Sequence, residues 1–148
     1  MKKIPYPDKP LKTNEDVRKH FEGLVSVAVS WLQIDGYCFT VHLPGEEAHE
    51  KEDCAASIRV KYPYKKFELY VQQDSVTKCL RENLSSPYWL NTEACIFHEL
   101  IHVILWRGVE LAHDRYTRSK EIDDENEFTT DHLTAVIYGL VKSFRKKK

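Results

Sequence analysis

The sequence predicts an α+β domain in which a small sheet packs on two long helices. Apolar residues recur at helical spacing near the N-terminus, alternate with polar residues over three short central runs, and return to helical spacing in the C-terminal half. A chain of 148 residues accommodates one domain with its own hydrophobic core. We therefore expect one domain over residues 14–148. An extended arm should precede it over residues 1–13, where three prolines disfavour regular structure.

The first element is predicted to be an amphipathic helix from Asn14 to about Gln33. Asn14 is the expected N-cap, and the two acidic residues after it suit the positive end of the helix dipole. We expect Asp35 and Gly36 to end this helix. Its buried stripe should consist of Val17, Phe21, Leu24, Val25, Ala28, Trp31 and Leu32.

The strands are expected at Tyr37–Leu43, Ser57–Tyr62 and Phe67–Val71, where β-type or alternating patterns occur. The second and third runs are separated by a short segment containing Pro63, which predicts a hairpin with this proline at its turn. The sheet should therefore contain three strands or slightly more, with at least one antiparallel pair. The acidic segment 45–53 is predicted to be an exposed loop.

Three helices should follow the strands. A short helix is predicted from Asp74 or Ser75 to about residue 83, and a central helix from Asn91 to Arg107, where Gly108 provides a stop signal. We expect residues 109–118 to form a polar connection. Ser119 should cap a second long helix, whose predicted buried stripe consists of Ile122, Phe128, Leu133, Val136, Ile137, Leu140, Val141 and Phe144.

Composition excludes several classes of function. The net charge of −1 argues against a general nucleic-acid surface, which needs a basic excess. The longest apolar stretch, Leu24–Leu32, is too short to cross a membrane. The four cysteines lack the C-x-x-C spacing of a cysteine metal site, and the N-terminus lacks the apolar run of a signal peptide. We therefore expect a cytoplasmic protein with reduced thiols.

The strongest chemical signal is the sequence H-E-x-x-H, from His98 through Glu99 to His102, within the central helix. Residues four apart share one face of a helix, so both imidazoles can bind one metal ion. Glu99 lies beside them, where it can deprotonate a water molecule. Burying two polar imidazoles on a largely apolar helix is energetically unfavourable if they serve only in packing. The motif therefore predicts a metal site.

A catalytic zinc ion needs a third protein ligand. Glu127 is the preferred candidate, because it lies on the next long helix and Asp131 follows it by four residues on the same face. Asp131 could then hold one of the ligand histidines in place. Four residues remain as alternatives for the third ligand: His113, His132, Asp131 and Glu125.

The pattern H-E-x-x-H followed by E-x-x-x-D, from Glu127 to Asp131, resembles that of the gluzincin metallopeptidases within the zincins. The resemblance implies a small zincin-like domain with zinc on His98, His102 and Glu127. It implies Glu99 as general base and Asp131 as the support of a ligand histidine. Small single-domain intracellular and phage zincins are most similar in size and order of elements. The metzincin pattern does not fit, because its glycine and third-ligand positions are occupied by other residues here.

The same resemblance implies a substrate peptide that pairs with the edge of the sheet, for which Ser57–Tyr62 and Phe67–Val71 are the available strands. Larger gluzincins add a donor to the transition-state oxyanion from a further domain. In this sequence we expect that donor to be local, with His113 and Tyr116 as the first candidates and Arg115 and Tyr138 as alternatives.

The sequence thus predicts a zinc-dependent metallopeptidase, specifically an endopeptidase, that acts on a protein or peptide substrate. An alternative is a zinc-stabilised protein-binding module with little or no turnover. A third possibility is a metal-free helical scaffold with incidental histidines. No nucleic-acid or membrane partner is expected.

Overall fold

The computed structural model describes residues 7, 9–34, 36–46, 54–61, 64–82, 91–115 and 119–146. Most of the expected N-terminal arm, segment 47–53 and Tyr116 lie outside the described residues. The predicted α+β class is confirmed. The elements are α1 (Asn14–Leu32), β1 (Cys38–His42), β2 (Ala56–Lys61), β3 (Lys66–Val71), α2 (Asp74–Glu82), α3 (Thr92–Arg115) and α4 (Ser119–Lys146).

The sheet is mixed and has the strand order β1-β3-β2. β2 and β3 form the predicted antiparallel hairpin, in which Ile58 pairs with Leu69. The turn expected at Pro63 lies outside the described residues. β1 pairs with β3 in parallel, so β3 is central and cannot accept a further strand. Of the two strands expected to offer an edge, only β2 can do so.

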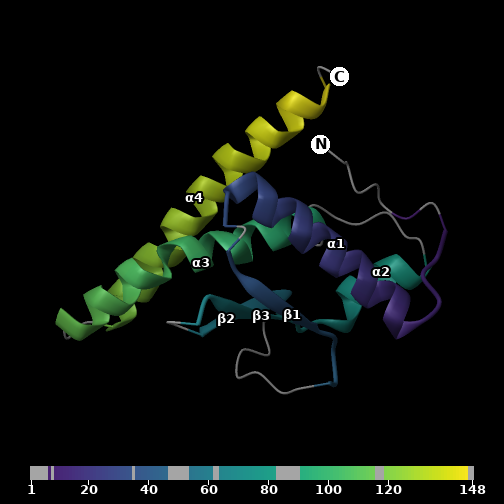
Figure 1. Ribbon diagram of the computed structural model, residues 1–148, viewed down its shortest axis with the longest axis horizontal. Helices are drawn as coiled ribbons and strands as arrows, with labels where there is room; N and C mark the ends of the chain where they lie inside the picture. The colour runs from purple at the N-terminus through teal and green to yellow at the C-terminus, as the bar shows by residue number, and fades with distance from the viewer. Residues whose placement is uncertain are drawn as a thin grey trace.

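The core lies between the sheet and the helices. Phe67, Leu69 and Val71 of β3 alternate with Glu68 and Tyr70, and they join one apolar cluster with residues of α1 and α3. Figure 1 shows α1 and α3 on one side of the sheet and α4 running along α3. None of the helices in the described part of the chain combines the length and apolar character that a membrane span requires.

The start of α1 differs from the prediction by one residue. Thr13, not Asn14, is the N-cap: its hydroxyl accepts a hydrogen bond from the Asp16 amide at 3.1 Å, and the Asp16 carboxylate accepts one from the Thr13 amide at 3.2 Å. The side chain of Asn14 instead accepts a hydrogen bond from Arg81 of α2. The helix ends at Leu32 because Gln33 adopts a left-handed conformation, with φ of 56°.

The predicted end of the central helix is wrong. α3 continues through Gly108 to Arg115, so most of the expected connection over 109–118 is helical. A glycine inside a helix costs only about 1 kcal/mol relative to alanine. The extra turns carry Val109 and Ala112, which are half-buried, and α3 and α4 pack on each other. Tertiary packing therefore outweighs the local stop signal.

The predicted buried stripe of α4 is only partly buried. Val141 is 1% exposed, and Ile122, Leu133 and Ile137 are half-buried. The helix instead buries Thr130 and Tyr138, which lie outside the predicted stripe. The remaining predicted members are exposed, at 69% for Phe128, 48% for Val136, 53% for Leu140 and 58% for Phe144.

Replacing the cap residue should destabilise α1. We expect Thr13→Ala to lower the free energy of unfolding by about 1 kcal/mol, because the amide that its hydroxyl satisfies loses its partner. Urea denaturation followed by circular dichroism measures this change. Thr13→Ser is the matched control, since it retains the hydroxyl and should stay near the wild-type value. Equal losses in both variants would contradict the capping role.

Candidate metal centre

Local sequence and the core together set the rotation of α3. Asn91 caps the helix through its side-chain oxygen, which accepts a hydrogen bond from the Ala94 amide at 3.2 Å. Phe97, Leu100 and Ile101 are at most 1% exposed. With these apolar residues turned into the core, His98 and His102 share a different face, at the side of the helix that α4 approaches.

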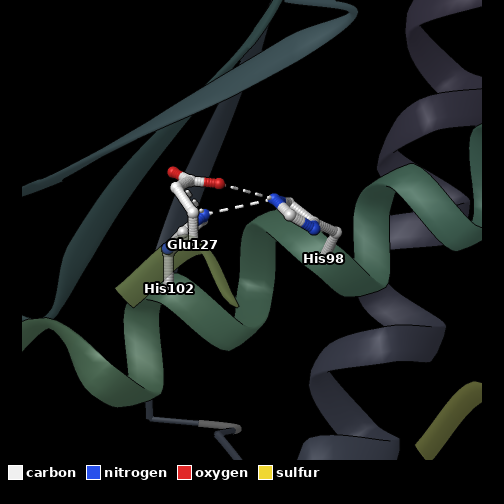
Figure 2. Close-up of side chains that lie close together, drawn as sticks. All are labelled: His98, His102 and Glu127. Atoms are coloured by element: carbon white, nitrogen blue, oxygen red, sulfur yellow. Dashed lines mark hydrogen bonds and ion pairs between the residues drawn. The ribbon is translucent and has the colours of Figure 1, made fainter. Parts of the chain in front are cut away.

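Two histidines of α3 and one glutamate of α4 converge on a single point (Figure 2). The two Nε2 atoms are 3.2 Å apart, and each lies 3.5 Å from an oxygen of Glu127. Ligand atoms placed about 2 Å from one tetrahedral ion are separated from each other by about 3.3 Å. The spacing of these three groups therefore fits a metal ion, and His98, His102 and Glu127 could hold one.

Asp131 lies one helical turn after Glu127 and contacts the other side of His98. Its Oδ1 is 3.0 Å from Nδ1 of His98. A proton on Nδ1 donated to this carboxylate leaves the lone pair of Nε2 directed at the other two candidate ligands. The four-residue step from Glu127 to Asp131 thus places one carboxylate on each nitrogen of His98.

His102 has two polar neighbours that the sequence analysis did not identify. Its Nδ1 is 3.3 Å from both the Thr130 hydroxyl and the Asn126 side-chain amide. Thr130 is completely buried. For Nε2 to bind a metal, Nδ1 must carry the proton and donate it, and the Thr130 hydroxyl can accept it. Asn126 and Thr130 are four residues apart, so the rule that paired Glu127 with Asp131 would have found them.

The orientation of the Asn126 amide bears on the same histidine. Its nitrogen faces Nδ1 of His102, and its oxygen is buried with no hydrogen-bond partner among the described residues. Exchange of the two amide atoms by rotation would present the oxygen to Nδ1 as an acceptor. That orientation suits a metal on Nε2 and gives the oxygen a partner.

The pKa of His98 is raised above its ordinary value of 6.5. Burial by itself lowers this pKa, because it disfavours the charged imidazolium. The hydrogen bond that His98 donates to Glu127 and the negative charges of Glu99, Glu127 and Asp131 outweigh burial. A cation, whether a proton or a metal ion, is therefore favoured at this position.

The three candidate ligands line a cavity of about 570 Å³. Glu99, which is 7% exposed, belongs to its wall and directly follows His98 in the chain. Ser57 and Ile58 of the edge strand β2 also line this cavity. The predicted base, the candidate metal ligands and a strand at the edge of the described sheet therefore share one cavity.

The alternative third ligands lie elsewhere. His113 is on α3, not on a connection, and its Nε2 is 3.1 Å from Asp123 of α4, at a part of the cavity distinct from the cluster. Glu125 and His132 are exposed and lie outside the cavity wall and the three-residue cluster. Asp131 contacts Nδ1 of His98, not the nitrogen that faces Glu127.

The residues predicted as transition-state donors differ in their position relative to the cavity. His113 lines the cavity, whereas Tyr116 and the Arg115 side chain lie outside the described residues. Tyr138 is buried, donates a hydrogen bond to Glu93 at 3.1 Å and is absent from the cavity wall. Its role is therefore structural.

The described cysteines form no disulfide, and Cys54 belongs to the cavity wall. Burial and the negative charge of Glu99 raise the pKa of the Cys95 thiol. Cys95 therefore stays protonated, as expected for a packed thiol and not for a metal ligand.

Comparison with protein-family models, with curated proteins and with solved structures finds no match to this chain. The functional argument therefore rests on the geometry of its own side chains.

Removing the hydroxyl of Thr130 should weaken metal binding. We expect Thr130→Val to lower metal affinity by about 10- to 100-fold, because His102 loses an acceptor for its Nδ1 proton. Zinc titration against a competing chelator measures the change. The matched control is Thr129→Val, at a position turned by about 100° along the helix, which should retain wild-type affinity. Unchanged affinity in Thr130→Val would show that this contact does not support the ligand.

Metal affinity should also depend on pH. A proton on His98 competes with the metal, and because the pKa of His98 is raised, affinity should begin to fall while the pH is still above 6.5. Asp131→Asn removes one of the charges that raise this pKa, so the fall should begin at a lower pH in that variant. Chelator competition across a pH series measures both curves. Identical onset in the two proteins would contradict the assignment to His98.

Proposed function

We propose that this protein is a zinc-dependent metallopeptidase. The observation that carries the proposal is the convergence of His98, His102 and Glu127 in a cavity that also contains Glu99. Two imidazoles and one carboxylate form a ligand set that suits zinc, and three protein ligands leave one coordination position open. The paired motifs also support the resemblance to gluzincins, which stays a prediction.

A bound zinc ion would supply a Lewis acid that polarises the scissile carbonyl and lowers the pKa of a water molecule at the site. The protein's own residues supply the rest. Asp131 and the pair of Asn126 and Thr130 hold the two imidazoles in orientation. Glu127 contributes the negative charge that completes the ligand set.

Glu99 is proposed as the general base. It follows His98 on the helix, is nearly buried and lies in the cavity wall, so its carboxylate can act within the reaction space. We propose that it accepts a proton from the attacking water and passes it to the leaving amine nitrogen. With these two proton transfers, Glu99 alone balances the protons of peptide-bond hydrolysis, and no second base is needed.

The substrate is proposed to bind as an added strand along β2. One side of β2 is occupied by its pairing with β3, and Ser57 and Ile58 bring the strand to the cavity. An extended peptide that hydrogen-bonds to the open side would pass the candidate metal ligands. This mode selects an extended backbone, and we propose an unfolded or loop segment of a protein as the substrate, in the cytoplasm.

The proposal is tested by Glu99→Gln. We expect this variant to keep zinc at the wild-type stoichiometry, because no candidate ligand is changed, and to lose peptide cleavage by about 100- to 10,000-fold. Zinc is measured by elemental analysis, and cleavage by mass spectrometry of an unfolded protein substrate. His98→Ala is the companion variant and should lose both zinc and cleavage.

Each other outcome has a defined meaning. Undiminished cleavage by Glu99→Gln would overturn the mechanism. A wild-type protein that binds and requires zinc for folding but cleaves no substrate would favour the binding module. Less than about a tenth of an equivalent of zinc would favour a metal-free scaffold.

A further inference from the structure

The cavity extends beyond the candidate metal ligands along the line where α3 and α4 pack. On α3, Trp106 follows His102 by four residues and lines the same cavity. On α4, Asp123 precedes Glu127 by four residues and lines it as well. Residues four apart share one face of a helix and are displaced by about 6 Å along its axis. Because α3 and α4 run antiparallel, both steps lead away from the metal ligands in the same direction.

We call this part of the cavity the distal subsite. Its described wall consists of Trp106, Val109, Glu110, His113, Asp123 and Asp124. Trp106 and Val109 are half-buried, whereas the three carboxylic residues are exposed. The subsite therefore combines an apolar, aromatic surface with acidic groups that lie nearer to solvent.

Trp106 has a hydrogen-bonding group that the protein leaves unused. Its indole nitrogen is buried and has no hydrogen-bond partner among the described residues. Buried donors in native proteins are usually satisfied. A bound molecule that offers an acceptor, such as a peptide carbonyl, would supply the missing partner.

The charge of the cavity wall is one-sided. Its described residues include no lysine or arginine, but they include five carboxylic residues: Glu99, Glu110, Asp123, Asp124 and Glu127. In the distal subsite, Asp123 lies 3.1 Å from Nε2 of His113. Glu110 and Asp124 form no ion pair or hydrogen bond within the described part of the chain. The subsite therefore has two carboxylates available for a cationic ligand.

The arrangement suits a long basic side chain better than a second metal ion. Among the described residues, the group whose ligand atoms converge closely enough for an ion is that of His98, His102 and Glu127, and the carboxylates of the distal subsite do not belong to it. The methylene stem of a lysine or arginine packs well on apolar surface while its charged head stays near water. An indole ring also attracts such a cation.

We propose that the distal subsite binds a lysine or arginine side chain of the substrate. The stem would pack against Trp106 and Val109, and the charged head would pair with Glu110 and Asp124. This inference rests on the proposed function, because it assigns a substrate residue to the same cavity. The subsite begins about 6 Å from the metal ligands, and an extended chain advances by about 3.3 Å per residue. The basic residue should therefore lie within about three positions of the scissile bond.

Peptide binding to the zinc-loaded Glu99→Gln protein tests the subsite without turnover. The probes are fluorescent ten-residue peptides in which one lysine, norleucine or glutamate is moved along an otherwise constant uncharged sequence. Fluorescence anisotropy should show that, at the best position, the lysine peptide binds at least about fivefold more tightly than the norleucine peptide. The glutamate peptide should bind more weakly than both. Added salt should reduce the preference for lysine, because it screens exposed charges.

Asp124→Asn, made in the same protein, should lower the ratio of lysine to norleucine affinity by about two- to fivefold, the range expected for a partly exposed ion pair. Glu125→Gln is the matched control. It removes the same charge from the neighbouring residue of α4, which is exposed and lies outside the described cavity wall, so the ratio should be retained. Circular dichroism checks that both variants keep their helical content.

Cleavage of the same peptides by the wild-type protein separates two kinds of failure. Cleavage together with equal affinity for lysine and norleucine peptides would overturn the inference and leave the proposed function intact. A lysine preference that Asp124→Asn weakens, without cleavage of any peptide, would overturn the proposed function and retain the subsite. Equal losses in Asp124→Asn and Glu125→Gln would indicate general attraction to an acidic surface and would overturn the inference, as would a protein that binds none of the peptides.

Discussion

The packing of α4 against α3 is the constraint on which the candidate site depends. α3 by itself supplies two imidazoles and Glu99, and these cannot complete a three-ligand site. The third group arrives because α4 runs along α3 in a register that places Glu127 3.5 Å from both histidines. The same register brings Asp131 to His98 and Thr130 to His102. A shift of one residue along α4 would turn these side chains by about 100°, and their contacts with His98 and His102 would be lost.

Electrostatics favours a cation at the point where α3 and α4 bring these groups together. Glu99, Glu127 and Asp131 surround His98 and together overcome the effect of burial on its pKa. Three negative charges around one imidazole favour a positive charge at this position. A proton on His98 partly meets that need, and a divalent ion between the three converging groups would meet it more fully. The residues that could bind an ion are thus also the ones whose charges favour a cation at this position.

α4 presents two different surfaces on two of its faces. One face carries Glu127, Thr130 and Asp131 towards α3, and the fixed geometry of a long helix keeps these groups aligned. Another face carries the stripe of Val136, Leu140 and Phe144, which no described element covers well. Helical periodicity gives the same apolar signal for both kinds of surface, since it reports spacing and not burial. That is why the sequence predicted a buried stripe where half of the residues are exposed.

The sequence by itself determined the elements and the chemistry of the motif. Alternation and helical spacing located the hairpin and the long helices, and the four-residue spacings paired His98 with His102 and Glu127 with Asp131. Local signals were less reliable at boundaries: α3 passes through Gly108 because packing on α4 outweighs one unfavourable residue. Only the tertiary structure decided that β2 forms the edge beside the cavity, that His113 pairs with Asp123, and that Asn126 and Thr130 contact His102. Each of these depends on how elements distant in the chain are placed against one another, and a spacing within one element carries no such information.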